Sequence, residues 1–102
     1  MDPEFDELKR EFLAEARGKV EEMERALGAG DSGARELVSY LAHQLKGAGG
    51  SYGFGQISTE AAEIEKIAES GTGEWNAAQT EGAAHCLQKL QDIIAERVRE
   101  LS

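Results

Sequence analysis

Residues 34–55 read ARELVSYLAHQLKGAGGSYGFG, a stretch that combines a helical pattern with an unusual density of glycine. Its apolar residues recur every three or four positions, which is typical of a helix with one buried face. The recurring residues are Ala34, Leu37, Val38, Leu41, Leu45 and Ala48. The spacing therefore predicts an amphipathic helix that has its apolar stripe against a core and its other side in water.

The same periodicity continues on both sides of this stretch. The further stripes are Leu8, Phe12, Ala16, Val20, Met23 and Leu27, then Phe54 or Ile57 with Ala61, Ile64 and Ala68, and finally Ala83, Leu87, Leu90, Ile94, Val98 and Leu101. Glycine-containing segments at 28–30 and 71–73 separate them, and no segment alternates like a half-buried strand. We expect helices at about 6–27, 33–51, 55–70 and 76–101, packed as an all-α, antiparallel up-down-up-down four-helix bundle.

Residue types at the helix ends fit these boundaries. Asp31 or Ser32 can cap the second helix, and Asn76 with Gln79 has the spacing of a capping box that opens the last one. The first five residues match what adjacent restriction cloning sites encode, so 1–5 is treated as a cloning scar and 6–102 as one domain.

Composition narrows the function classes. The chain has 102 residues, 40% of them hydrophobic, and 20 acidic against 11 basic side chains give a formal charge of −9. This balance argues against nucleic acid as a partner, because no basic patch could displace enough phosphate counterions. No apolar run is long enough for a membrane span, and the single cysteine favours neither a disulfide nor a zinc site. With no signal peptide in the sequence, we expect a cytoplasmic protein.

The residue that stands out is a histidine on the polar side of the second helix. At about 100° per residue, His43 lies about 180° from Ala34 and so faces water. Gly47 and Gly50 lie about 40° and 20° to either side of it, and Lys46 about 60° away. An exposed imidazole bordered by bare backbone and by a cation is a surface that another protein can approach closely.

Two plainer interpretations remain open at this point. A helix continuing to Ser51 would contain Gly47, Gly49 and Gly50 at a combined cost of about 2–3 kcal/mol. The helix could instead end near Lys46, with the glycines in a loop. His43 could also be merely a solvated polar residue, although the lysine and glycines on its face favour a function.

Imidazole chemistry fits that function. Its pKa near neutrality leaves a ring nitrogen available as a nucleophile, and exposure on a helix suits transfer between proteins. Metal binding is disfavoured, because the other histidine, His85, is expected on the outer face of the last helix with no ligand spacing. A nucleotide loop is also disfavoured, since Lys46 precedes the glycines instead of following them.

The run from His43 to Phe54 resembles the signature of histidine-containing phosphotransfer (HPt) domains. Lysine three residues after the histidine, and glycine four, seven and ten residues after it, are all present at Lys46, Gly47, Gly50 and Gly53. The ending Tyr52-Gly53-Phe54 is most similar to the HPt module of chemotaxis-type histidine kinases. The resemblance covers nearly the whole chain, because HPt domains are four-helix bundles with an exposed histidine.

The resemblance implies a role for three side chains and a pair of partners. His43 would accept a phosphoryl group from a histidine kinase catalytic domain or a receiver and exchange it with an aspartate of a response-regulator receiver domain. Lys46 would be the phosphate-side cation, and Glu65, 22 residues after the histidine, would fix its tautomer. The domain itself would bind no cofactor or metal, since the Mg²⁺ belongs to the partner receiver.

The expected interface centres on His43, with the neighbouring positions Ser39, Gln44, Gly47 and Gly50 around it. The sequence holds no nucleotide-binding domain, so we expect no autonomous kinase activity; an excised module and a free-standing shuttle both remain open. The alternative function is a non-catalytic helical adaptor that docks a receiver domain. An enzyme acting on small molecules is disfavoured, because no constellation of acids, bases and oxyanion donors is visible.

Overall fold

The computed structural model describes residues 3–30, 33–71 and 74–101, which form four helices and, within these ranges, no strand. The helices are α1 (Pro3–Ala29), α2 (Ala34–Ser51), α3 (Gly55–Glu69) and α4 (Ala77–Leu101). Their bounds lie close to the predicted ones, with the largest difference at the start of α1, which begins at Pro3 instead of residue 6. The predicted all-α four-helix fold is confirmed.

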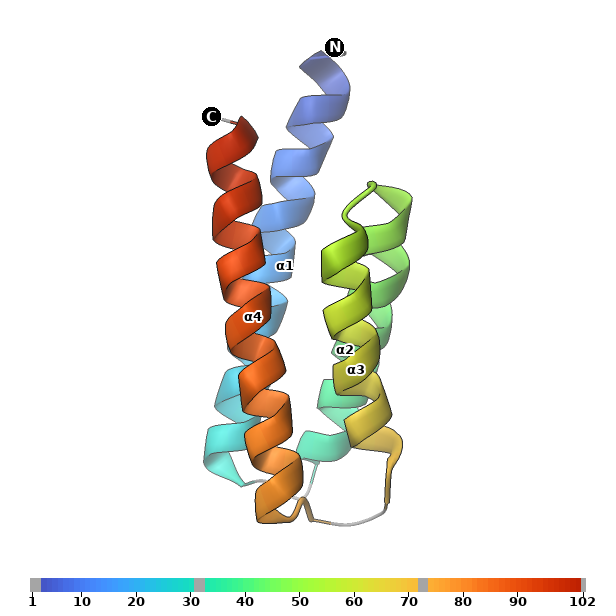
Figure 1. Ribbon diagram of the computed structural model, residues 1–102, viewed down its shortest axis with the longest axis vertical. Coiled ribbons are helices and arrows are strands. Elements are labelled where there is room, and N and C mark those ends of the chain that lie inside the picture. The colour runs from blue at the N-terminus through green and yellow to red at the C-terminus, as the bar shows by residue number, and fades with distance from the viewer. Residues whose placement is uncertain (1–2, 31–32, 72–73, 102) are drawn as a thin grey trace.

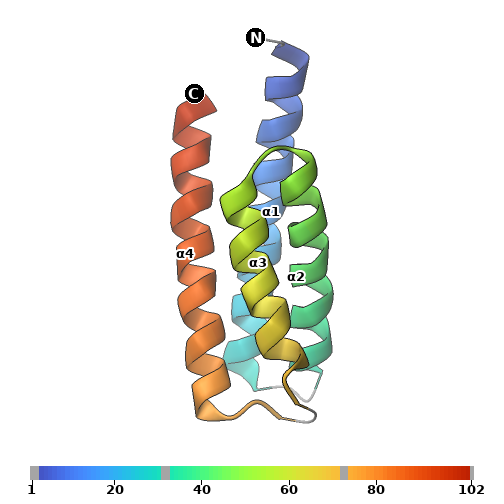
Figure 2. The same cartoon turned by 45° about the vertical axis from the view of Figure 1, so that its right-hand side comes forward.

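The helices form a ring around one core. α1 packs on α2 and α4, and α3 packs on the same two helices. The colour gradient in Figure 1 runs down α1, up α2, down α3 and up α4, and Figure 2 shows the same order from another side. The fully buried side chains include Leu13, Met23, Leu45, Ile57, Ile64, Leu87, Leu90 and Ile94.

One predicted core position is wrong. Leu8 is 46% exposed, although it continues the apolar stripe of α1. The N-terminal part of α1 extends beyond the hairpin of α2 and α3 (Figure 1), and Tyr52 at the end of α2 stacks on Phe5 and Phe12, leaving Leu8 between them exposed. Leu13, which was not assigned to the stripe, is fully buried.

Helix ends follow the expected chemistry. In the capping box, the Gln79 N–H donates to Asn76 Oδ1 at 2.8 Å and the Asn76 N–H to Gln79 Oε1 at 3.1 Å, which confirms that prediction. α1 ends before Gly30, whose φ of 62° is left-handed. The proposed caps Asp31 and Ser32 lie outside the described residues, as do positions 72–73.

The second helix does not end near Lys46. It continues to Ser51, so the interpretation of the glycines as a loop is wrong. The turn that follows is closed by backbone hydrogen bonds from Gly53 to the Gly50 carbonyl (3.2 Å) and from Phe54 to the Gly49 carbonyl (2.8 Å). Gly53 has a φ of 82°, a conformation that glycine adopts without strain.

This turn sets α3 closely against α2. A Cβ on the buried Gly49 would lie 3.2 Å from the Ser58 backbone nitrogen and 3.3 Å from Ile57 Cγ2. The Ser58 hydroxyl donates to the Lys46 carbonyl at 2.8 Å. At the other end of the pair, the buried Arg35 guanidinium donates to the Ala68 carbonyl at 2.7 Å. These contacts fix the register that brings the outer faces of both helices to one site.

Candidate functional site

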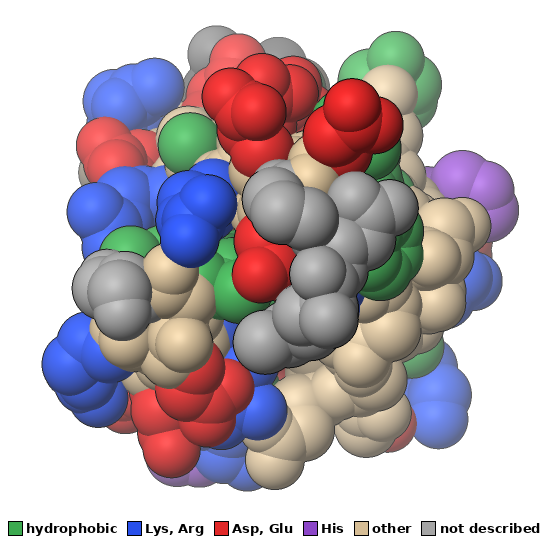
Figure 3. Space-filling model, turned by 90° about the horizontal axis from the view of Figure 1, so that it is seen from above, with side chains coloured by type: hydrophobic (Ala, Val, Ile, Leu, Met, Phe, Trp, Pro, Cys, Tyr) green, Lys and Arg blue, Asp and Glu red, His purple; other side chains and the backbone are tan. Residues whose placement is uncertain are grey.

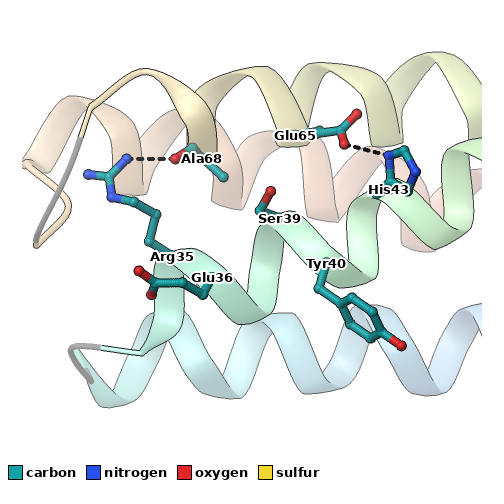
Figure 4. Close-up of a pocket in the computed structure, with 7 residues that line it drawn as sticks. All are labelled: Arg35, Glu36, Ser39, Tyr40, His43, Glu65 and Ala68. Atoms are coloured by element: carbon teal, nitrogen blue, oxygen red, sulfur yellow. Dashed lines mark hydrogen bonds and ion pairs between the residues drawn. The ribbon is translucent and has the colours of Figure 1, made fainter.

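His43 lies on the outer face of α2, as the helical wheel predicts. Its side chain is 69% exposed, whereas the adjacent Ala42 is completely buried. One ring nitrogen points toward α3 and the other away from it (Figure 4). The ring is therefore open to a partner while one of its edges is held by the protein.

The group that holds the ring is the Glu65 carboxylate of α3. Glu65 Oε2 lies 2.7 Å from His43 Nδ1, and Oε1 accepts a hydrogen bond from Lys46 Nζ at 2.6 Å. The Glu65 side chain is only 12% exposed, while that of Lys46 is 39% exposed. One nearly buried carboxylate thus joins the imidazole and the ammonium, and the structure brings together His43, Lys46 and Glu65.

The charge of this carboxylate follows from its surroundings. The hydrogen bond from Lys46 lowers the pKa of Glu65; burial opposes this, and the hydrogen bond with His43 lowers the pKa further. The net shift is downward from the ordinary value of 4.5, so the carboxylate is ionised at neutral pH. An ionised carboxylate only accepts hydrogen bonds, so the hydrogen between the two groups sits on His43 Nδ1. In the neutral ring, Nε2 then carries the free lone pair.

A shallow hollow adjoins the histidine on the side of the N-terminal half of α2 (Figure 4). It is lined by Arg35, Glu36, Ser39, Tyr40 and His43 from α2 and by Glu65 and Ala68 from α3. On the opposite side of the histidine, Gly47 and Gly50 are exposed, with no atom of a neighbouring element within 4 Å of where a Cβ would stand. The histidine lies between a hollow and a stretch of open backbone.

The remaining predicted positions take different places around this site. Ser39 lines the hollow. The Gln44 amide does not reach toward the histidine but donates through Nε2 to Tyr40 Oη at 2.9 Å. Tyr40 and Glu36 were not predicted as site residues, although their spacings of three and seven residues before His43 place them on its face of the helix. Arg35 was not predicted either, because a buried cation gives no periodic signal.

The structure describes no second site of this kind. His85 is exposed on α4, as predicted. Among residues 3–30, 33–71 and 74–101, no group of three or more His, Cys, Asp or Glu side chains could hold a metal ion. In the view along the bundle (Figure 3), histidine side chains stand at the outline of the molecule and both signs of charge occur on the face shown.

No helix within the described ranges has the length and apolarity to cross a membrane.

Comparison with known proteins agrees with the geometry. The family model described as Hpt domain matches residues 7–99, which is nearly the whole chain. No curated protein and no solved structure matched the sequence. Hpt domains carry out histidine phosphotransfer in phosphorelay signalling, where they partner with response-regulator receiver domains. The match covers nearly the whole chain, and the structure is a four-helix bundle with an exposed histidine. The chain therefore belongs to the Hpt domain family.

Proposed function

We propose that the chain is a phosphorelay carrier in which His43 accepts a phosphoryl group and exchanges it with an aspartate of a response-regulator receiver domain. The observation that carries this proposal is the arrangement of the ring. Nδ1 is bound to Glu65 at 2.7 Å while the side chain as a whole is 69% exposed. The nucleophilic nitrogen therefore faces the solvent, where a second protein can bring its phosphate.

The transfer step needs no base from this chain. The Nε2 lone pair attacks the phosphorus of the receiver's aspartyl phosphate, a new N–P bond forms, and the P–O bond breaks with its electron pair going to the aspartate carboxylate. The Nδ1 hydrogen stays in place, so the ring becomes cationic. Glu65 stabilises that positive charge across the existing hydrogen bond. The reverse step returns the phosphoryl group to the receiver.

Lys46 places a positively charged group beside the histidine ring. Its ammonium has three N–H donors, and the bond to Glu65 uses one of them. Because Lys46 follows His43 by nearly one turn and is 39% exposed, it can reach a phosphoryl oxygen on the ring while it remains near Glu65. This supports a role as the phosphate-side cation, although in the unphosphorylated protein its ammonium is bound to the carboxylate.

The partner surface is proposed to surround the histidine, with Ser39, Gln44, Gly47 and Gly50 contributing. The open backbone at Gly47 and Gly50 allows close approach. The Mg²⁺ and acidic pocket that phosphoryl transfer requires belong to the receiver. The ending Tyr52-Gly53-Phe54 and the contact between Glu65 and His43 support the chemotaxis-type branch of these domains. In that branch a histidine kinase catalytic domain would donate the phosphate. The scaffold would be an antiparallel up-down-up-down bundle, which the chain directions in Figure 1 support.

The proposal is tested by incubating the protein with a panel of purified receiver domains that carry a labelled aspartyl phosphate. The chain has two histidines, and both are exposed, so His85→Gln is a matched control for His43→Gln. We expect wild type and His85→Gln to take up label that is stable to alkali and lost in acid. His43→Gln should take up none.

Two results would oppose the proposal. Undiminished labelling of His43→Gln would place the acceptor elsewhere. Stable binding of a receiver with no exchange of phosphate in either direction would instead indicate a non-catalytic adaptor.

A further inference from the structure

Tyr40 is an exposed aromatic side chain next to the proposed phosphotransfer site. Three large hydrophobic side chains are exposed among the described residues: Phe5 (41%), Leu8 (46%) and Tyr40 (61%). Phe5 and Leu8 lie on the N-terminal turns of α1, whereas Tyr40 lies on α2, three residues before His43. Tyrosine and tryptophan are the residues that most often anchor protein interfaces, because they bury a large area at a small cost in conformational entropy.

The Tyr40 side chain is held in place before any partner arrives. Its hydroxyl accepts a hydrogen bond of 2.9 Å from Gln44 Nε2, one helical turn further along α2. This bond restricts the side chain without covering the ring, which stays the most exposed of the large hydrophobic groups. An anchor that is ordered in advance loses less entropy on binding.

The hollow beside Tyr40 is continuous with the reactive histidine. Its lining includes His43 and Glu65, and its surface is mostly apolar. In Figure 4 the small Ser39 side chain lies on the side of α2 that faces Glu65, whereas the Tyr40 ring points to the other side of this helix. A protein whose phosphorylated aspartate reaches His43 must lie over the neighbouring surface, so the hollow falls within its contact area.

From these observations we propose that Tyr40 and this hollow form the docking anchor for the receiver domain, and that the hollow receives an apolar side chain of that domain. The inference rests on the proposed function, since it names a second binding element of the same site. Most of the binding free energy of the receiver domain then comes from contacts on the side of His43 toward the N-terminus of α2. The opposite side, at Gly47 and Gly50, provides clearance and little contact.

Steady-state phosphotransfer separates docking from chemistry. The receiver is the member of the panel that accepts phosphate fastest from the wild-type protein, and its KM and kcat are measured with wild type, Tyr40→Ala and Leu8→Ala. Leu8→Ala is the matched control, because it also removes an exposed large hydrophobic side chain, but on α1. We expect Tyr40→Ala to raise KM by about tenfold or more with kcat within about twofold, as for loss of an interface anchor. Leu8→Ala should leave both constants unchanged.

A second variant tests the hollow without removing the ring. Ser39→Leu fills the space beside His43 and should raise KM in the same way, while Tyr40→Phe, which keeps the ring, should stay within about threefold of wild type. A wild-type KM for Tyr40→Ala or Ser39→Leu overturns the proposal. So does a loss confined to kcat, which would assign the effect to the reaction step.

Failure of this inference can be told apart from failure of the proposed function. Phosphoramidate, a small phosphoryl donor that needs no docking surface, should label His43 equally in wild type and Tyr40→Ala. Equal labelling combined with an unchanged KM for the receiver rejects the docking anchor alone. Absence of labelling in the wild type would reject His43 as acceptor, and the docking inference with it.

Discussion

The Glu65 carboxylate determines how the other two ionisable side chains of the site are held. It accepts hydrogen bonds from His43 Nδ1 at 2.7 Å and from Lys46 Nζ at 2.6 Å, and its side chain is only 12% exposed. These two donors, Lys46 foremost, outweigh the effect of burial, so the pKa of the carboxyl lies below its usual value. In return it sets the tautomer of the ring and keeps the ammonium beside it.

Replacing this carboxylate with an amide should slow the chemistry while the acceptor nitrogen stays exposed. In Glu65→Gln the amide no longer compensates the positive ring formed on transfer, so labelling of His43 by phosphoramidate should fall by about tenfold or more. The measurement is the initial rate of phosphohistidine formation. The control is Glu63→Gln, because Glu63 is 53% exposed and pairs with Lys66 on the same helix. A wild-type rate for Glu65→Gln would show that the carboxylate has no part in the reaction.

The lowered pKa of Glu65 also makes the stability of the protein depend on pH. A carboxyl group whose pKa is lower in the folded than in the unfolded chain stabilises the fold above its unfolded pKa, which is near 4.5. That contribution disappears as the pH falls through the lower, folded value. Urea unfolding should therefore show that Glu65→Gln is less stable than wild type at pH 7, with the difference shrinking toward pH 3. A difference that is the same at both pH values would contradict the assigned shift.

The sequence could predict the exposed histidine, because helical periodicity alone assigns a face to each residue. It could not predict that Lys46 binds Glu65, since the helical wheel says nothing about which residue of α3 lies opposite. Glu65 itself was found only through the spacing that the family resemblance supplied. Tyr40 was missed although its spacing was readable, because one exposed tyrosine is not informative until the hollow beside it is seen.

The hairpin of α2 and α3 is the element that assembles the site. The two helices have to lie close together, since His43 and Lys46 come from one of them and Glu65 from the other. Gly49 permits this approach, because a Cβ there would stand 3.2 Å from the Ser58 backbone nitrogen and 3.4 Å from the Phe54 carbonyl oxygen. The glycines of α2 thus divide into one that packs and two, Gly47 and Gly50, that face open space.

Alanine substitutions should separate these two classes of glycine. Gly49→Ala forces backbone atoms of α3 to move, so it should lower the free energy of unfolding by about 1–3 kcal/mol despite the better helix propensity of alanine. Gly47→Ala meets no neighbour and should raise it by about 0.5–1 kcal/mol. Chemical denaturation of both variants measures the difference. If Gly49→Ala were as stable as Gly47→Ala, the close packing of the hairpin would be incorrect.

Periodicity and glycine positions were sufficient to predict the four helices and the capping box at Asn76. They were insufficient at Leu8, where the stripe continues although the side chain is 46% exposed. They also left open whether α2 passes through its glycines. The answer depends on the packing of Gly49 against α3, which is a tertiary contact.

The molecule as a whole keeps its core and its reactive group apart. It is an elongated bundle of 46 × 19 × 17 Å, with fully buried residues such as Leu45 and Ile64 inside. His43 stands on the outside of that bundle, 69% exposed, on the same helix as the buried Leu45. A charge added to the ring therefore enters water and not the core.

Phosphorylation should consequently leave the fold almost unchanged. In ¹H–¹⁵N spectra of the phosphorylated and unphosphorylated protein, we expect shifts confined to the residues around His43 on α2 and around Glu65 on α3. Amides of α1 and α4 should keep their positions. Shifts spread over all four helices would indicate a conformational change that the exposed position of the ring does not predict.

The most direct test of the central claim is to identify which nitrogen carries the phosphate. The protein is labelled with ¹⁵N-histidine and phosphorylated by phosphoramidate, and long-range ¹H–¹⁵N spectra are recorded for the ring nitrogens. Because Nδ1 keeps its hydrogen on Glu65 at 2.7 Å, we predict a single phosphohistidine with the N–P bond at Nε2 of His43. Phosphate on Nδ1 of His43, or on His85, would contradict this account.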